Sequence, residues 1–257
     1  MASRRHAREA IDGGRVTVAG APALKATRLV APDEPVVVSG EAPRFVSRGG
    51  EKLAGAVDRF HMAGAIENAR ALDAGASTGG FTDCLLQAGA AHVVAVDVGY
   101  GQVHERIRTD SRVEIHERTN IREVKAGDLG DPFDVVVADL SFISLKTVAP
   151  NLVALAKPGA ALVLLVKPQF EAGREEATRG KGVIRDPSVW RRVLGEVDAA
   201  YRAVGAVMME GMASPLRGAD GNVEFLVHAR KAAEPGPEPA IDLDEMIAEA
   251  GEAGAAR

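Results

Sequence analysis

The 257-residue chain has 46% hydrophobic and 26% charged residues, an ordinary globular composition that excludes disordered, collagen-like and coiled-coil proteins. Its single cysteine excludes an intrachain disulfide and a cysteine-rich zinc site, and its scattered histidines form no HExxH motif, so we expect no metal. The net charge of −5 is unevenly placed, because residues 234–257 carry seven acids against one base and the beginning of the chain is basic.

The beginning of the chain predicts a small basic module. Residues 4–12 have a helical pattern that ends at Gly13-Gly14, and two β-like pieces follow at 16–18 and 36–38. This beginning lacks the apolar core and the small-residue cleavage site of a signal peptide. The most apolar stretch, 148–166, contains Lys-Pro-Gly and falls short of a membrane-spanning helix. We therefore expect a soluble cytoplasmic protein that does not insert into membranes.

From about residue 43 the sequence alternates between strand and helix patterns. Runs such as VVVAD and ALVLLVK are continuously apolar, as expected of strands covered on both faces. The alternation predicts a doubly wound α/β sheet of seven strands, and the turn-rich SPLRGADG favours an antiparallel last strand. The predicted strands are 71–73, 92–97, 112–116, 133–139, 160–167, 206–212 and 222–229, and the predicted helices are 79–89, 101–109, 120–127, 143–156 and 187–204.

The end of the chain is acidic and opens with a stiff proline-rich linker, EPGPEPA, at 234–240. The residues after the linker have the composition of a short acidic helix or of a disordered segment. We therefore expect three parts: a basic module at 1–42, a main domain at 43–232 and a flexible acidic tail at 233–257.

The segment ALDAGASTGGFT, residues 71–82, carries the main sign of a ligand. A strand ends at Asp73, a loop of small residues follows, and a helix begins near Gly79, so backbone amides and the positive helix end can face a ligand. The loop lacks the GxGxxG spacing of nicotinamide enzymes, which remain a weaker alternative, as does a plain turn. A carboxylate at Asp73 suits the ammonium of S-adenosylmethionine, Asp97 can accept bonds from ribose hydroxyls, and Asn120 can reach the adenine edge. The expected cofactor residues are Asp73, Gly75, Ala76, Ser77, Thr78, Gly79, Gly80, Phe81, Asp97, Val98, Asn120 and Asp139.

Seven blocks between about residue 3 and residue 230 share their sequence with one known family. The blocks are SRGGEKL (47–53), LDAGASTGGFT (72–82), AVDVGYGQ (95–102), ERTNIR (117–122), VVADLSFISL (136–145), LVKPQFEAG (165–173) and SPLRGADGNVEF (214–225). Together they resemble the TlyA family of ribosomal RNA 2′-O-ribose methyltransferases, whose members are also described as hemolysins. The resemblance implies a Rossmann-like methyltransferase fold, S-adenosylmethionine as cofactor, and ribosomal RNA or ribosomal subunits as substrate, with cytidine as the expected nucleotide.

The resemblance also implies a catalytic tetrad. The family's Lys-Asp-Lys-Glu residues fall on Lys52, Asp139, Lys167 and Glu224. Asp139 ends the fourth predicted strand and Lys167 the fifth, at the sheet edge where ligands bind in such folds. We assign Lys167 as the base that removes the proton of a ribose hydroxyl. The charge of Lys52 would favour the neutral amine of Lys167, whereas the carboxylates of Asp139 and Glu224 would favour its ammonium form and orient it.

The segment HAREAIDGGRVTVAG, residues 6–20, resembles the second half of the S-four-type RNA-binding domain of this family, and the family's preceding helix is absent from the sequence. The basic helix and strand of such a partial domain contact the RNA backbone. The expected RNA contacts are Arg4, Arg5, Arg8, Arg15, Lys25, Arg28 and Arg48.

Three classes of function compete. An enzyme that methylates ribosomal RNA is favoured by the tetrad and the cofactor loop. The alternative is an RNA- or ribosome-binding protein for which methylation is not the main role. A membrane-active hemolysin is least favoured, because the sequence has no long cationic amphipathic stretch.

Overall fold

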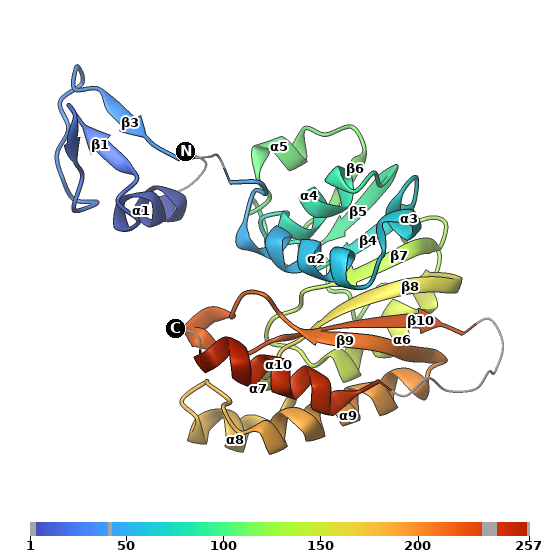
Figure 1. Ribbon diagram of the computed structural model, residues 1–257. Helices are drawn as coiled ribbons and strands as arrows, with labels where there is room; N and C mark the ends of the chain where they lie inside the picture. The colour runs from blue at the N-terminus through green and yellow to red at the C-terminus, as the bar shows by residue number, and fades with distance from the viewer. Residues whose placement is uncertain (1–3, 41–42, 233–240, 256–257) are drawn as a thin grey trace. The chain divides into compact units, whose positions relative to one another are not determined.

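The computed structural model describes residues 4–40, 43–232 and 241–255 of the chain. The chain divides into two compact units between Arg44 and Phe45, and each unit has a hydrophobic core of its own (Figure 1). The proline-rich linker at 234–240 lies outside the described residues.

The first unit is a short helix with a small antiparallel sheet. Helix α1 and strands β1 and β3 have the predicted bounds, and the two-residue strand β2 is an addition that the sequence pattern does not indicate. The sheet order is β2-β1-β3, and its core is made of Ala10, Val16, Val18 and Ala23. The elements are α1 (Arg4–Asp12), β1 (Val16–Val18), β2 (Ala21–Pro22) and β3 (Val36–Val38).

The second unit contains the predicted seven-stranded sheet, in the order β6-β5-β4-β7-β8-β10-β9. Strands β6, β5, β4, β7 and β8 are parallel, and β10 runs antiparallel to both β8 and β9, which confirms the predicted fold. The strands are β4 (Arg70–Ala74), β5 (His92–Val96), β6 (Val113–His116), β7 (Phe133–Ala138), β8 (Ala156–Val166), β9 (Ala206–Ala213) and β10 (Phe225–Lys231).

Helices cover both faces of this sheet, which explains why its central strands are continuously apolar. Successive residues of β7 enter different cores: Val135 and Val137 join the cluster of α2 and α4, whereas Val136 joins that of α6 and α9 (Figure 1). The helices are α2 (Arg48–Arg59), α3 (Ala63–Ile66), α4 (Gly80–Gln87), α5 (Glu105–Arg108), α6 (Leu145–Leu155), α7 (Pro168–Glu171), α8 (Arg174–Arg179), α9 (Pro187–Arg202) and α10 (Leu243–Ala255), with a 3₁₀ turn, η1 (Ala219–Gly221).

The predicted helix at 120–127 is wrong, because these residues form turns. The side chain of Asn120 accepts a hydrogen bond from the Arg122 amide (3.1 Å), and that of Asp128 accepts one from the Lys125 amide (2.8 Å). Such side-chain bonds compete with the helical ladder and favour turns. The predicted helix at 101–109 shrinks to the four residues of α5.

The expected flexible tail also needs correction. Residues 243–255 form helix α10, which packs on β9 and α9 (Figure 1). Met246 and Ala250 are only 1% and 3% exposed, and Met246 fills the space above Gly211, where a Cβ atom would overlap its sulfur. The acidic helix is therefore part of the sheet's hydrophobic core.

Candidate active site

The carboxyl ends of the parallel strands surround a cavity of about 520 Å³. The strand order reverses at β4, between β5 and β7, and the crevice at such a switch point is where α/β sheets bind ligands. The volume lies within the usual range for small-molecule sites. The lining residues come from the loops after β4, β5, β6 and β7: Gly75, Ser77, Val96, Asp97, Val98, Gln102, Thr119, Asn120, Ile121, Arg122, Asp139, Leu140, Ser141, Phe142 and Ile143.

Gly75 allows two of these loops to approach each other. Its φ is +91°, and a Cβ atom built on it would lie 2.5 Å from the backbone oxygen of Asp139. The loops are also joined to the sheet, because the Gly75 amide donates to the Val96 carbonyl (2.8 Å) and the Asp139 amide to the Ala74 carbonyl (3.0 Å). Only glycine fits this position without a backbone shift.

Asp97, directly after β5, connects the loop after β4 with the loop after β5. Its Oδ2 accepts a hydrogen bond from the Ser77 amide (2.8 Å) and its Oδ1 accepts one from the Gly99 amide (2.6 Å). A carboxylate oxygen has two lone pairs, so both oxygens can still accept a further hydroxyl. The half-buried Asp97 is thus fixed in place and open to a ligand in the cavity.

Asp73 is fully buried in β4, two positions before the cavity-lining Gly75. Its Oδ2 accepts a hydrogen bond from the Thr82 hydroxyl (2.6 Å), whereas its Oδ1 has no hydrogen-bond partner among the described residues. Removal from water raises the pKa of the Asp73 carboxyl to about 7. A buried oxygen of this kind suits a donor carried by a ligand.

The raised pKa predicts that the ligand-free protein loses stability as the pH rises from 5 to 7. In this window the unfolded chain has released the Asp73 proton and the folded chain retains it, so folding takes up a proton. The free energy of unfolding should therefore fall by up to about 1.4 kcal/mol per pH unit from this group. Urea unfolding of the wild type and of Asp73→Asn at pH 5, 6 and 7 measures the difference between their slopes.

The control for this measurement is Asp128→Asn, on an exposed loop, which should keep the wild-type slope. Identical slopes in the wild type and Asp73→Asn would show that Asp73 is ionised at pH 5 and contradict the prediction.

The expected cofactor residues divide into two groups. Gly75, Ser77, Asp97, Val98, Asn120 and Asp139 line the cavity, whereas Asp73, Ala76, Thr78, Gly79, Gly80 and Phe81 do not. Gly80 and Phe81 are buried between α4 and α2, and a Cβ atom on Gly80 would overlap the Ser47 hydroxyl. These two residues therefore set the position of α4.

Lys167 directly follows β8, as the N-cap of α7, and is only 7% exposed. Its Nζ forms an ion pair with Asp139 Oδ1 (2.5 Å) and donates a hydrogen bond to Ser141 Oγ (3.0 Å). Both partners lie on the loop after β7 that also lines the cavity. The amine is thus held at the edge of the ligand site by groups that can orient it.

The other two members of the expected tetrad form a second buried ion pair. Lys52 of α2 contacts Glu224, which precedes β10, and the two residues are 9% and 3% exposed. The antiparallel register pairs Phe225 with Val166, so Glu224 follows on opposite Lys167. The structure therefore brings the four residues to one edge of the sheet as two Lys–carboxylate pairs.

Sequence reasoning missed several residues of this edge. Phe142 lines the cavity, is 92% exposed and has a φ of +64°, which is rare for a bulky residue. Its ring lies 5.1 Å from that of Phe170. Gln102, Ser141 and Arg122 also line the cavity. The usable signal for Phe142 is an aromatic residue three positions after Asp139, at the end of a predicted strand, in a chain with 4% aromatic residues.

The expected RNA contacts fall in both units. The side chains of Arg4 and Arg5 lie outside the described part of the structure. In the first unit, Arg8, Lys25 and Arg28 are exposed and Arg15 is half-buried, and Arg28 pairs with Glu34 (3.6 Å). Arg48 is exposed at the start of α2 in the second unit.

The described residues contain no group of three or more His, Cys, Asp or Glu side chains placed to hold a metal. Among the same residues, no helix has the length and apolar character needed to cross a membrane.

Known proteins resemble this chain over most of its length. A model of the family described as FtsJ-like methyltransferase matches residues 45–231. The chain is 47% identical over 229 residues to the 16S/23S rRNA (cytidine-2′-O)-methyltransferase TlyA of Mycobacterium tuberculosis, which covers 89% of this chain and 84% of that protein.

Two solved structures resemble it as well. One, described as a hemolysin from Streptococcus thermophilus, has a TM-score of 0.81 and 35% identity, and the match covers 99% of this chain and 92% of that one. The other, described as an S-adenosylmethionine-dependent methyltransferase from Listeria monocytogenes, has a TM-score of 0.52 and 16% identity and covers 70% of this chain and 99% of that one. At that identity the second likeness shows the fold alone.

Proposed function

We propose, since the chain belongs to the TlyA family of FtsJ-like methyltransferases, that it transfers a methyl group from S-adenosylmethionine to the 2′-oxygen of a ribose in ribosomal RNA, with cytidine as the nucleotide. The observation that carries this proposal is the Lys167–Asp139 ion pair at the edge of the cavity, beside the Lys52–Glu224 pair. A base held next to a cofactor site is what a weakly acidic hydroxyl requires.

The residues of the cavity fit S-adenosylmethionine. Next to the cavity lining, the buried Oδ1 of Asp73, which has no hydrogen-bond partner within the described part of the chain, suits the ammonium of the methionine part. Asp97 retains lone pairs for the two ribose hydroxyls, and Asn120 lies in the cavity wall for the adenine edge. Bound there, the cofactor supplies a methyl group on a positively charged sulfur.

The tetrad supplies the proton transfer. Lys167, as a neutral amine, takes the proton of the 2′-hydroxyl while the oxygen forms its bond to the methyl carbon. The S-adenosylmethionine held in the cavity would supply the methyl group and become S-adenosylhomocysteine, and Lys167 would pass its proton to solvent. Asp139 and Ser141 orient the amine through contacts of 2.5 and 3.0 Å. The Lys52–Glu224 pair holds α2 against the end of β10 beside them.

The surroundings of the site suit an RNA substrate. Arg122 lines the cavity and is exposed, as are Arg179 at the end of α8 and Lys181 and Arg185 between α8 and α9. None of these four forms an ion pair within the described residues. Unpaired cations can neutralise phosphates. The exposed ring of Phe142 at the cavity offers a surface on which a base can stack.

The test of the function is methyl transfer from radiolabelled S-adenosylmethionine to purified ribosomal subunits, followed by mapping of the modified nucleotide. The expected result is one label per target ribose, at the 2′-oxygen. Tight binding to subunits without any transfer would favour the alternative of an RNA- or ribosome-binding protein. Label on a base would contradict the ribose assignment.

The first unit is proposed to bind the RNA backbone, which predicts a salt effect. Replacing Arg4, Arg5 and Arg8 with glutamine should reduce the slope of log affinity against log salt by about three units, roughly one for each lost phosphate contact. Cofactor affinity should stay the same. Filter binding of ribosomal RNA from 50 to 300 mM salt measures the slope.

The matched control is Arg112→Gln, because Arg112 is engaged by Asp110 (2.8 Å) at the amino end of β6, away from the cavity. Its slope should equal that of the wild type. An unchanged slope in the triple variant would contradict the prediction that the basic start of the first unit contacts the RNA backbone.

A further inference from the structure

The segments that leave β7 and β8 run side by side beyond the ends of the strands. Three sets of contacts join residues 139–145 to residues 167–171. Lys167 forms an ion pair with Asp139 and a hydrogen bond with Ser141. The centre of the Phe170 ring lies 5.1 Å from that of Phe142. Glu171 accepts hydrogen bonds from Ser144 and Leu145. From Val135 onward, the paired residues of β7 and β8 are 26 positions apart in the sequence. The residues joined by these side-chain contacts are 26 to 28 positions apart, so the contacts continue the parallel pairing beyond the ends of the strands.

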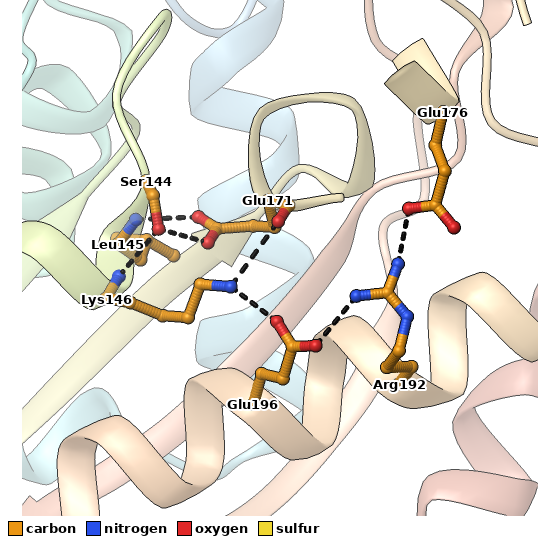
Figure 2. Close-up of polar contacts among 7 residues, drawn as sticks. All are labelled: Ser144, Leu145, Lys146, Glu171, Glu176, Arg192 and Glu196. Carbon is orange, nitrogen blue, oxygen red and sulfur yellow. Dashed lines mark hydrogen bonds and ion pairs between the residues drawn. The ribbon is translucent and has the colours of Figure 1, made fainter. Parts of the chain in front are cut away.

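Glu171 forms the last of these contacts and is only 6% exposed. Its Oε2 accepts a hydrogen bond from the Ser144 hydroxyl (2.5 Å), and its Oε1 accepts one from the Leu145 amide (2.6 Å). Figure 2 shows both bonds at the start of α6. Burial raises the pKa of the Glu171 carboxyl, and these bonds and Lys146 oppose the rise.

A second layer of charges supports this contact from α9. Lys146 Nζ bonds the Glu171 carbonyl (3.4 Å) and Glu196 (2.5 Å), and Glu196 also bonds Arg192 (2.7 Å). Arg192 reaches on to Glu176 of α8 (Figure 2). The outer charges are exposed or half-buried, whereas Glu171 is buried, so the inner contact is the part that holds the two segments.

The start of α6 does not itself need Glu171. Ser144 is already the N-cap, and its side-chain oxygen accepts a hydrogen bond from the Lys146 amide (3.1 Å). A buried carboxylate is costly to keep. What Glu171 adds is a bond between the segment that carries Lys167 and the segment that carries Asp139 and Ser141.

We propose that Glu171 is a positioning residue for methyl transfer: it locks the segment after β7 against the segment after β8 and so fixes Asp139 and Ser141 against the Lys167 amine. The inference rests on the proposed function, because it concerns the base of that reaction. Among the described residues, the hydrogen bonds of the Glu171 side chain go to Ser144 and Leu145 rather than to Lys167 or Asp139, so Glu171 acts through the backbone between them.

Three variants separate positioning from simple stability. Glu171→Ala removes both bonds and should slow single-turnover methylation by about 10- to 100-fold, since small misplacements of reacting groups have effects of this size. Its affinity for S-adenosylmethionine should stay within about twofold of the wild type. Glu171→Gln keeps an acceptor for the Leu145 amide and a donor for the Ser144 oxygen, and should restore the rate to within about threefold. Arg192→Gln breaks only the outer charges and should leave the rate unchanged.

Each outcome has a defined meaning. A wild-type rate in Glu171→Ala, or an equal loss in Arg192→Gln at matched urea stability, would overturn the proposal. If Glu171→Ala does not fold, Ser144→Ala removes one of the two bonds and should slow transfer by about three- to tenfold with unchanged cofactor affinity; an unchanged rate would overturn it. A wild-type protein that transfers no methyl group would instead refute the proposed function itself.

Discussion

Replacing Lys167 with arginine is expected to slow methyl transfer by roughly 100- to 10,000-fold, the usual effect of losing a general base. Arginine keeps the positive charge and most of the length, so it can still pair with Asp139, but it cannot lose its proton in a protein. Affinity for RNA and for S-adenosylmethionine should therefore persist. Single-turnover methylation at saturating ribosomal RNA measures the rate, with binding of both ligands checked separately.

The sheet offers a matched control at its other end. Lys157, in the same strand β8, pairs with Asp134 of β7 (2.6 Å), as Lys167 pairs with Asp139 after the same strand. Lys157→Arg should leave the rate near normal because this pair lies at the amino ends of the strands. Near-normal turnover in Lys167→Arg would mean that Lys167 supplies only charge, and another group would have to remove the proton.

Removing one partner of the Lys52–Glu224 pair should have the largest effect on stability. Glu224→Ala leaves Lys52 buried without its carboxylate, and breaking a buried pair in this way costs about 3–5 kcal/mol. Replacing both residues by apolar ones of similar volume, Lys52→Met with Glu224→Leu, should recover most of that loss. Urea unfolding of the wild type, Glu224→Ala and the double variant gives the free energies.

The double variant also tests whether the pair takes part in the reaction. If the charges of Lys52 and Glu224 assist the proton transfer of Lys167, the double variant should fold with near-normal stability and transfer methyl groups at least about 100-fold more slowly, the lower end of the usual effect of losing an acid or base. A double variant with normal stability and a normal rate would show that the pair only joins α2 to β10.

The central strands could be predicted from sequence because β5, β7 and much of β8 are apolar runs bounded by turn residues or by an acid. The error in β8 shows the limit of that signal. The strand begins at Ala156 and includes Lys157-Pro158-Gly159, which the sequence pattern assigns to a loop. The strand is longer than predicted because Ala156 pairs with Phe133, ahead of a shift in the pairing register between β7 and β8. Helix α10 was not clearly predicted because its burial depends on Gly211, far away in the sequence.

The candidate site could be predicted only in part. The cofactor loop carries a local signal, so Gly75 and Asp97 could be found from their positions at strand ends. Lys52 and Glu224 are 172 positions apart, and no spacing rule connects them, so they came from the family resemblance alone. Glu171 and Ser141 have no sequence signal, because their role depends on how two neighbouring loops run past each other.

The order of the strands along the chain also affects protein synthesis. A nascent chain of 143 residues already contains every residue that lines the cofactor cavity, but neither Lys167 nor Glu224. At about 5–20 residues per second, Glu224 is added roughly 4–16 seconds later. A partly made chain therefore contains the residues of the cofactor wall seconds before it contains the base and the second ion pair, so we expect no copy to modify RNA before Glu224 has been added.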